Sequence, residues 1–181
     1  GVTTVRIVTR PEKADLIAYA RESGLEVVLG HPATLAASLQ LGMAGLANDQ
    51  VVVAGFPDSV WSPLDGFVRV LDLHSKQSDD IALGLFRSDE LERMEAVSFN
   101  PDGRVLAIEF RPLRPTTRWM WGCLAARVGS LSGLAAYAEP GPFLDARARA
   151  GGVWGVPLGR YVDVGTAAAY ASAQADPIIW L

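Results

Sequence analysis

The chain has 181 residues, half of them hydrophobic, which suffices for one well-filled domain and is short for two. Its net charge of -4 leaves no positive excess for a nucleic-acid backbone, and a single cysteine, Cys123, excludes an internal disulfide or a site of several thiolates. No apolar run approaches the roughly 20 residues of a membrane span. We therefore expect one domain over residues 1–181, cytoplasmic, without nucleic-acid or membrane partners.

The first part of the sequence alternates strand and helix patterns. Apolar runs predict strands at residues 5–9 and 25–29 and from Val51, and helix-forming segments lie between them at residues 11–23 and 33–47. Strand, helix, strand is the repeating unit of a parallel sheet with helices on both faces. Because the chain opens directly on a strand, we also expect that it is truncated at its N-terminus.

The rest of the sequence predicts a mixed sheet. An Asp-Gly pair between alternating runs at residues 96–99 and 104–110 is typical of an antiparallel hairpin. The other predicted elements are helices at 63–75, 131–138 and 142–150, strands at 81–86, 119–125 and 153–156, and a helix from Ala167 that Thr166 can cap. The apolar tail, residues 176–181, is expected to dock on the core or on a partner subunit.

Two aspartates follow strand patterns. Asp58 comes directly after the apolar run from Val51, which we interpret as a central strand; ligands bind at such strand ends in open α/β sheets, although an Asp after a strand can also merely cap a turn. Asp163 lies among apolar neighbours in GRYVDVGT. Burial of its charge would require a cation, an arginine or several donors nearby. The two residues are more than 100 positions apart, so spacing alone does not show that they meet.

Other polar residues have weaker functional patterns. Arg111, Arg114 and Arg118 in the loop after the hairpin could bind a phosphate or could form a solvated surface. His31 and His74 are interpreted as structural. The sequence contains no Gly-rich phosphate loop, no His/Cys metal cluster and no Ser/His/Asp context.

Four segments resemble the sugar-nucleotide-forming nucleotidyltransferases, such as the glucose-1-phosphate thymidylyltransferase and mannose-1-phosphate guanylyltransferase groups. They are GVTTVRIVTR, VVVAGFPDSVWSPLDGF, SFNPDGRVLAIEFRP and GGVWGVPLGRYVDVGTAAAYASA, and the last is the most specific. The resemblance implies a three-layer α/β/α fold with a mixed, mostly parallel sheet, of the nucleotide-diphospho-sugar transferase type, in which the first strand and phosphate loop are missing.

The resemblance also implies a reaction and its residues. Asp58 and Asp163 would together hold one Mg²⁺ while a sugar 1-phosphate attacks a nucleoside triphosphate and pyrophosphate leaves. Arg111 stands where the family has a lysine that binds the sugar phosphate, Tyr161 would lie near the sugar, and Glu109 is a further substrate-binding candidate. Homo-oligomers are possible in such a protein. The resemblance specifies neither the nucleotide nor the sugar.

The sequence departs from the family at several positions. The Gly-rich motif that should precede Gly1 is absent, Phe110 replaces the usual acidic residue, and Glu95 stands near Met94 where a glycine is expected. An unrelated doubly wound module would leave the hairpin and the GRYVDVGT stretch unexplained, and two stronger hypotheses remain. An enzyme, a Mg²⁺-dependent sugar-1-phosphate nucleotidyltransferase, is favoured by the contexts of Asp58 and Asp163; a non-catalytic binding or regulatory subunit of the same fold is favoured by the departures.

Overall fold

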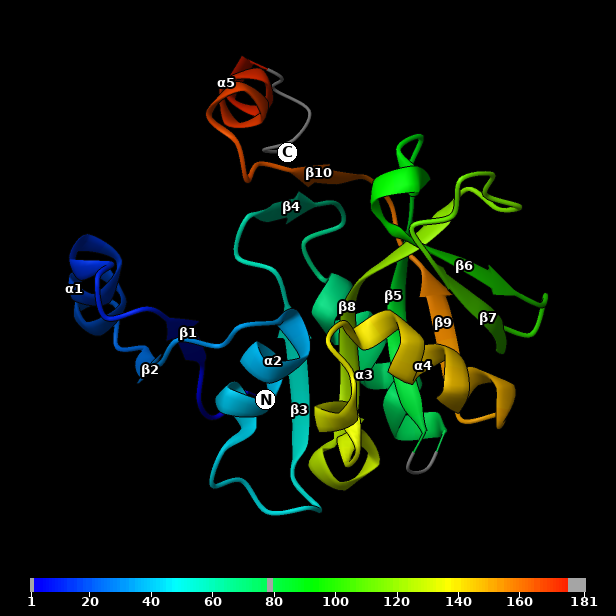
Figure 1. Ribbon diagram of the computed structural model, residues 1–181, viewed down its shortest axis with the longest axis horizontal. Helices are drawn as coiled ribbons and strands as arrows, with labels where there is room; N and C mark the ends of the chain where they lie inside the picture. Colours follow the sequence, from blue (N-terminus) through cyan, green and yellow to red (C-terminus); the bar gives the residue numbers. More distant parts are fainter. Residues whose placement is uncertain (1, 78–79, 176–181) are drawn as a thin grey trace.

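A mixed six-stranded sheet forms the centre of the protein in a computed structural model that describes residues 2–77 and 80–175 (Figure 1). The strands are β1 Arg6–Thr9, β2 Glu26–Leu29, β3 Val51–Gly55, β4 Ser59–Trp61, β5 Ile81–Arg87, β6 Glu95–Phe99, β7 Val105–Phe110, β8 Trp119–Arg127, β9 Val153–Pro157 and β10 Tyr161–Asp163. The α-helices are α1 Ala14–Glu22, α2 Leu35–Met43, α3 Gly66–Lys76, α4 Pro140–Arg149 and α5 Ala167–Ala175. Three short 3-10 helices are η1 Leu91–Arg93, η2 Val128–Leu131 and η3 Leu134–Ala136.

Strand β8 organises the sheet. It pairs antiparallel with β3, β5 and the hairpin strand β6, and β9 pairs parallel with β5. Strands β3, β5, β6 and β9 therefore share one direction, opposite to β7 and β8. The helix α3 covers one face, whereas α2 and α4 cover the other. The predicted α/β class, with three layers and a mixed sheet, is confirmed.

The buried strands have continuous apolar sequences because both of their faces are covered. Residues 81–86 of β5 are all buried, and Ile81, Leu83 and Leu85 point into the cluster under α2 and α4. Ala82 and Phe86 point into the second cluster, under α3. The alternation of a pleated strand thus supplies both cores from one segment.

The N-terminal strands form a separate parallel pair. Arg6 of β1 is opposite Glu26 of β2, and α1 connects the two strands as predicted. The Arg6 guanidinium donates hydrogen bonds to the carbonyls of Gly42 and Ala44, which ties β1 to α2. Within the described residues β1 pairs only with β2, and β3 only with β8, so each has an unpaired edge. Figure 1 shows α2 between them.

Two local predictions differ from the structure. The strand from Val51 is at the border of the six-stranded sheet in the described chain, because an apolar run does not reveal how many neighbours a strand has. The helix expected at 131–138 is replaced by η2 and η3, separated by Gly133 at a φ of 91° that interrupts a continuous helix. The tail at 176–181 lies outside the described residues.

No helix in the described part of the chain has the length and apolar character needed to cross a membrane.

Candidate functional site

A short two-stranded ribbon brings distant segments together above the end of the six-stranded sheet (Figure 1). After β3 the chain turns, and the amide of Ser59 donates to the carbonyl of Phe56 at 3.3 Å. Strand β4 then pairs antiparallel with β10, with Asp163 opposite Ser59. In this register Val164 faces Asp58, so the two aspartates are on neighbouring positions of the ribbon.

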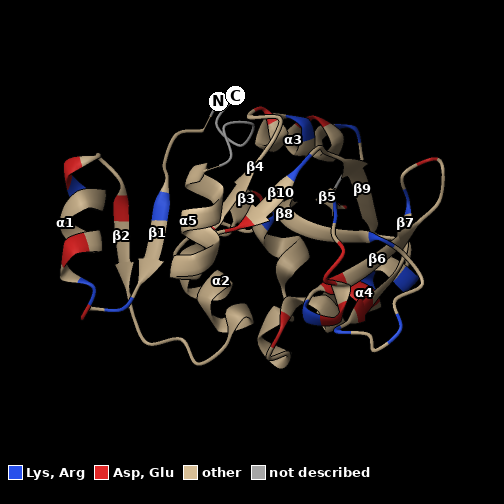
Figure 2. Ribbon diagram, turned by 90° about the horizontal axis from the view of Figure 1, so that it is seen from above, with Lys and Arg blue, Asp and Glu red and all other residues tan. Residues whose placement is uncertain are grey.

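The two aspartates converge on Gly165. The amide of Val164 donates to the Asp58 carbonyl at 2.8 Å, and the amide of Gly165 donates to Oδ1 of Asp163 at 2.7 Å. A Cβ placed on Gly165 would lie 3.0 Å from Oδ1 of Asp163 and 3.0 Å from Oδ2 of Asp58. These two oxygens can therefore be no further apart than twice that distance. Figure 2 shows the acidic end of β10 beside α5.

The chemistry of this pair fits a hard divalent cation. Both carboxylates are exposed, and none of the ion pairs among the described residues involves Asp58 or Asp163. Nor does the described chain contain a group of three or more His, Cys, Asp or Glu residues suited to a metal. Mg²⁺ commonly takes one or two protein carboxylates and fills its other positions with water and phosphate oxygens. The pair meets that requirement.

Tyr161 borders the carboxylates on the same face of the ribbon. Its hydroxyl and the Ser59 hydroxyl form a 2.8 Å hydrogen bond, and its ring packs 5.2 Å from that of Phe86. Burial raises the pKa of Tyr161 above its ordinary value; the Ser59 hydrogen bond opposes this, and the charges of Asp163 and Asp58 reinforce it. The phenol therefore remains neutral at physiological pH.

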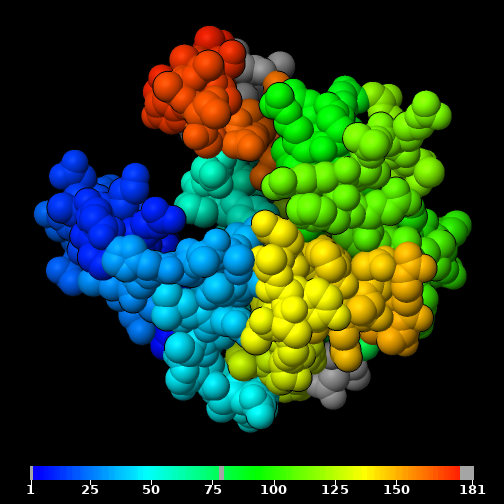
Figure 3. Space-filling view, viewed as in Figure 1, coloured from blue at the N-terminus to red at the C-terminus, as the bar shows by residue number. Residues whose placement is uncertain are grey.

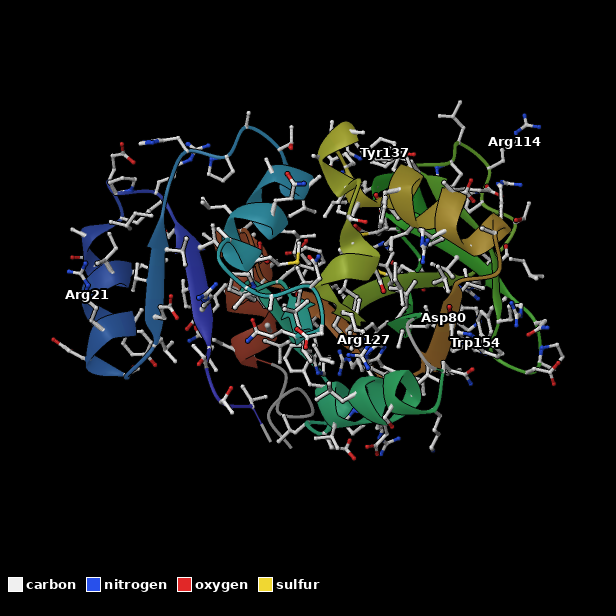
Figure 4. All side chains as sticks on the ribbon, turned by 90° about the horizontal axis from the view of Figure 1, so that it is seen from below. Arg21, Asp80, Arg114, Arg127, Tyr137 and Trp154 are labelled. Carbon is white, nitrogen blue, oxygen red and sulfur yellow. The ribbon has the colours of Figure 1, made fainter. Side chains whose placement is uncertain are left out.

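The other predicted substrate residues are not in contact with the aspartates among the described interactions. The Arg111 guanidinium lies over the ring of Phe110 at 4.8 Å, and Arg111 has a left-handed backbone with φ of 44°. Glu109 accepts a 3.5 Å hydrogen bond from the Thr116 hydroxyl. Figure 4 shows Arg114 pointing away from the body of the protein.

Arg118 forms an exposed ion pair with Asp89 and lines a polar pocket with Arg87, Ser88 and Asp89. The predicted arginine loop thus does not form one cluster. Figure 4 also shows Asp80 beside Trp154, whose indole N–H donates to it at 2.9 Å. Trp154 is in β9, so this contact belongs to the sheet, not to the ribbon.

Asp163 lies among apolar residues in the sequence, but the structure does not bury it. Its side chain is exposed, because β10 belongs to a two-stranded ribbon and an apolar sequence context does not guarantee cover on both faces. The Gly165 amide donates a hydrogen bond to its carboxylate. The capping role of Thr166 is confirmed, since its hydroxyl accepts from the amide of Ala169 at 3.1 Å.

The surface is indented on one side of the ribbon. Figure 3 shows a notch between the N-terminal segment and α5, at the level of the β4 segment. Sequence reasoning did not identify Ser59 or Gly165 as parts of the site, because neither residue type is distinctive without the β4–β10 pairing. Glu95 was noted only as a departure from the family, although its contacts extend towards this site.

Comparison with known proteins supports the fold. No protein-family model and no curated protein matches the sequence. A solved structure from Bacillus anthracis, provisionally assigned as a glucose-1-phosphate thymidylyltransferase and crystallised with sucrose, superimposes with a TM-score of 0.81 at 18% identity. The match covers 96% of this chain and 76% of that one. The protein therefore has a nucleotidyltransferase-like α/β fold.

Proposed function

We propose that this protein transfers a nucleotidyl group from a nucleoside triphosphate to a sugar 1-phosphate, with Mg²⁺, and yields an NDP-sugar and pyrophosphate. The observation that carries the proposal is the approach of Asp58 and Asp163 to the same point above Gly165. It occurs in a nucleotidyltransferase-like fold and beside an open notch (Figure 3). Both carboxylates would be Mg²⁺ ligands.

The reaction requires charge neutralisation more than acid–base chemistry. An oxygen of the sugar phosphate forms a bond to the α-phosphorus of the triphosphate. The bond from that phosphorus to the oxygen that bridges it to the β-phosphorus breaks, and pyrophosphate leaves with the electron pair. A bound Mg²⁺ would neutralise phosphate oxygens during this exchange. Asp58 and Asp163 would hold the ion, and the neutral Tyr161 would offer its ring edge and hydroxyl to the sugar.

Arg111 and Glu109 are proposed to complete the sugar-phosphate site. A guanidinium can hold a phosphate through two parallel hydrogen bonds, and a carboxylate can accept from sugar hydroxyls. Arg111 is exposed, and its guanidinium lies over the face of Phe110, so it could turn towards a bound phosphate at the cost of that ring contact.

The triphosphate would need further donors. We propose that a strand and a Gly-rich loop from residues upstream of the described segment supply them, with that strand pairing against the unpaired edges of β1 and β3. Backbone amides of such a loop bind phosphates through their partial positive charges.

The experiment measures pyrophosphate release. The protein, with any upstream residues that its reading frame encodes, is given Mg²⁺ and panels of nucleoside triphosphates and hexose 1-phosphates. We expect release with at least one pair of substrates, and a loss of at least about 100-fold in Asp163→Asn, as for removal of a metal ligand or its support. Asp102→Asn, an exposed carboxylate in the hairpin turn, is the matched control and retains activity. No release across the panels would overturn the proposal.

A second candidate is a non-catalytic binding or regulatory subunit. The observation that favours it is the Glu95 side chain, which carries a carboxylate into a position where the resembled family has glycine and which approaches the backbone of Gly141. This candidate predicts binding of a nucleotide or NDP-sugar in calorimetry without any pyrophosphate release. Reading the upstream frame separates the two, since a strand followed by a basic Gly-rich loop favours the enzyme.

A further inference from the structure

Glu95 is held at the junction of a strand and a helix, outside the site described above. Its Oε2 accepts a hydrogen bond from Nε1 of Trp121 at 2.5 Å, and its Oε1 accepts one from the amide of Gly141 at 2.9 Å. Gly141 is in the first turn of α4, whose partial positive charge favours a carboxylate. Both oxygens therefore have a donor, which a half-buried charge needs.

Trp121 carries this restraint to the Asp58 turn. Its side chain is 5% exposed in the core, and its ring lies 5.5 Å from that of Phe56, centroid to centroid. Phe56 begins the turn that the Ser59 amide closes, and Asp58 is inside that turn. Glu95 is thus connected to the Asp58 turn in two steps: its hydrogen bond to Trp121, and the ring contact of Trp121 with Phe56, the first residue of that turn.

We infer that Glu95 is a positioning residue for the cation pair: it fixes the indole of Trp121, against which Phe56 packs, and so holds the Asp58 side chain near that of Asp163. This inference rests on the proposed cation site. Asp58 itself is exposed and belongs to a turn that emerges from a border strand, so its position depends on what anchors Phe56. A tryptophan that is both packed and hydrogen-bonded through its N–H provides a rigid anchor.

The chain offers a matched control in Asp145. Its Oδ1 accepts from the amide of Ile108 at 2.8 Å and its Oδ2 from Nε of Arg149 at 2.7 Å, so it also ties α4 to a strand through a half-buried carboxylate. In the described chain its hydrogen bonds and ion pair go to Ile108 and Arg149 rather than to Trp121 or Phe56. Neutralising Asp145 therefore perturbs the attachment of α4 without disturbing the connection to Asp58.

The experiment measures Mn²⁺ binding, by electron paramagnetic resonance of the free ion, to the full protein and its variants. In Glu95→Gln one carboxylate oxygen is replaced by an NH₂ group. That group can only donate, and it would face an N–H donor, so one of the two hydrogen bonds is lost. We expect about three- to tenfold weaker Mn²⁺ binding, in line with couplings carried by packed networks. Phe56→Leu should weaken binding similarly, whereas Asp145→Asn should not.

Non-additivity gives a readout that a general loss of stability would not produce. If Glu95 acts through Phe56, the double variant Glu95→Gln/Phe56→Leu binds Mn²⁺ no more weakly than the weaker single variant. Trp121→Phe, which keeps a ring against Phe56 but lacks the N–H, tests the same connection if Glu95→Gln folds poorly, and should also weaken binding.

The outcomes separate this inference from the proposed function. Equal Mn²⁺ affinity in wild type, Glu95→Gln and Trp121→Phe would overturn the positioning role and leave the cation site intact. An equal loss in Glu95→Gln and Asp145→Asn would also overturn it, because any loosening of α4 would then suffice. Absence of Mn²⁺ binding by the wild type would overturn the cation site and the positioning role with it.

Discussion

The six-stranded sheet and the β4–β10 ribbon are built on different principles. Residues 81–86 in β5 are buried on both faces, so their identity is dictated by packing. The ribbon is two-stranded, and Asp163 at its end is exposed, so its identity is not needed for a core. What matters in the ribbon is register, because a shift of one residue would exchange the faces of β10. Substitutions in the buried sheet should therefore change the free energy of unfolding, whereas substitution of Asp163 should change cation binding with little effect on stability.

One buried ring connects the two regions. Phe86 is fully buried in the sheet, and its ring centroid lies 5.7 Å from Trp61 in β4 and 5.2 Å from Tyr161 in β10. The ribbon thus docks on the core through aromatic contacts, with its aspartates beyond them. Substitutions on either side of this junction should have different effects.

The largest expected effect is in the sheet. Leu83 is fully buried in β5, and Leu83→Ala should lower the free energy of unfolding by about 2–5 kcal/mol through lost burial and the cavity that remains. Leu106→Ala, at a residue that is 51% exposed, should change it by less than about 0.5 kcal/mol. Urea unfolding measures both. Equal losses would contradict the placement of the core.

An intermediate effect is expected where α4 meets Glu95. Helix propensity favours Gly141→Ala by about 1 kcal/mol, but the added Cβ would overlap the Glu95 carboxylate. We expect a net destabilisation of about 1–3 kcal/mol, because the displaced carboxylate loses its donors. In a Glu95→Ala background the same substitution should be neutral or stabilising in urea unfolding. The same sign in both backgrounds would show that the contact is absent.

A smaller effect should appear with pH. Burial raises the pKa of Glu95 above its ordinary 4.5, opposed by the hydrogen bonds from Trp121 and Gly141. A raised pKa means that the folded protein retains this proton more strongly, so the group's contribution to stability is full below pH 4.5 and is lost as pH rises through the folded pKa.

The wild type should therefore lose stability relative to Glu95→Gln as pH is raised from 4 towards neutrality, since glutamine does not titrate there. Urea unfolding at several pH values measures the difference between the two proteins. If the difference in unfolding free energy between the two proteins did not change with pH, burial would not be raising the pKa of Glu95.

The sequence alone predicted the sheet better than the ribbon. The apolar runs that became β5, β8 and β9 and the Asp-Gly hairpin are local signals, and the structure has strands at each. Strand β4 was missed because three residues carry too little periodicity, and its partner β10 lies about 100 positions further along the chain. Pairing of that kind is settled by tertiary contacts.

The candidate site required more than local pattern. Asp58 and Asp163 were linked by resemblance to a family, not by spacing, and only the register of β4 and β10 explains why they converge. Asp163 has apolar neighbours in the sequence, but only the Tyr161 end of β10 packs on Phe86, and Asp163 lies at the exposed end. Glu95 stood out only as a carboxylate where the resembled family has glycine, and its partners were not predictable because its donors come from β8 and α4.

The most direct test of the cation pair is calorimetric titration of Mg²⁺ into wild type, Asp58→Asn, Asp163→Asn and the double variant. We predict one ion bound by the wild type, a large loss of affinity in either single variant, and no further loss in the double variant, because one ion needs both carboxylates. The single variants should keep the wild-type stability in urea, since both residues are exposed. Unchanged Mg²⁺ binding in Asp163→Asn would contradict the pairing of the two aspartates.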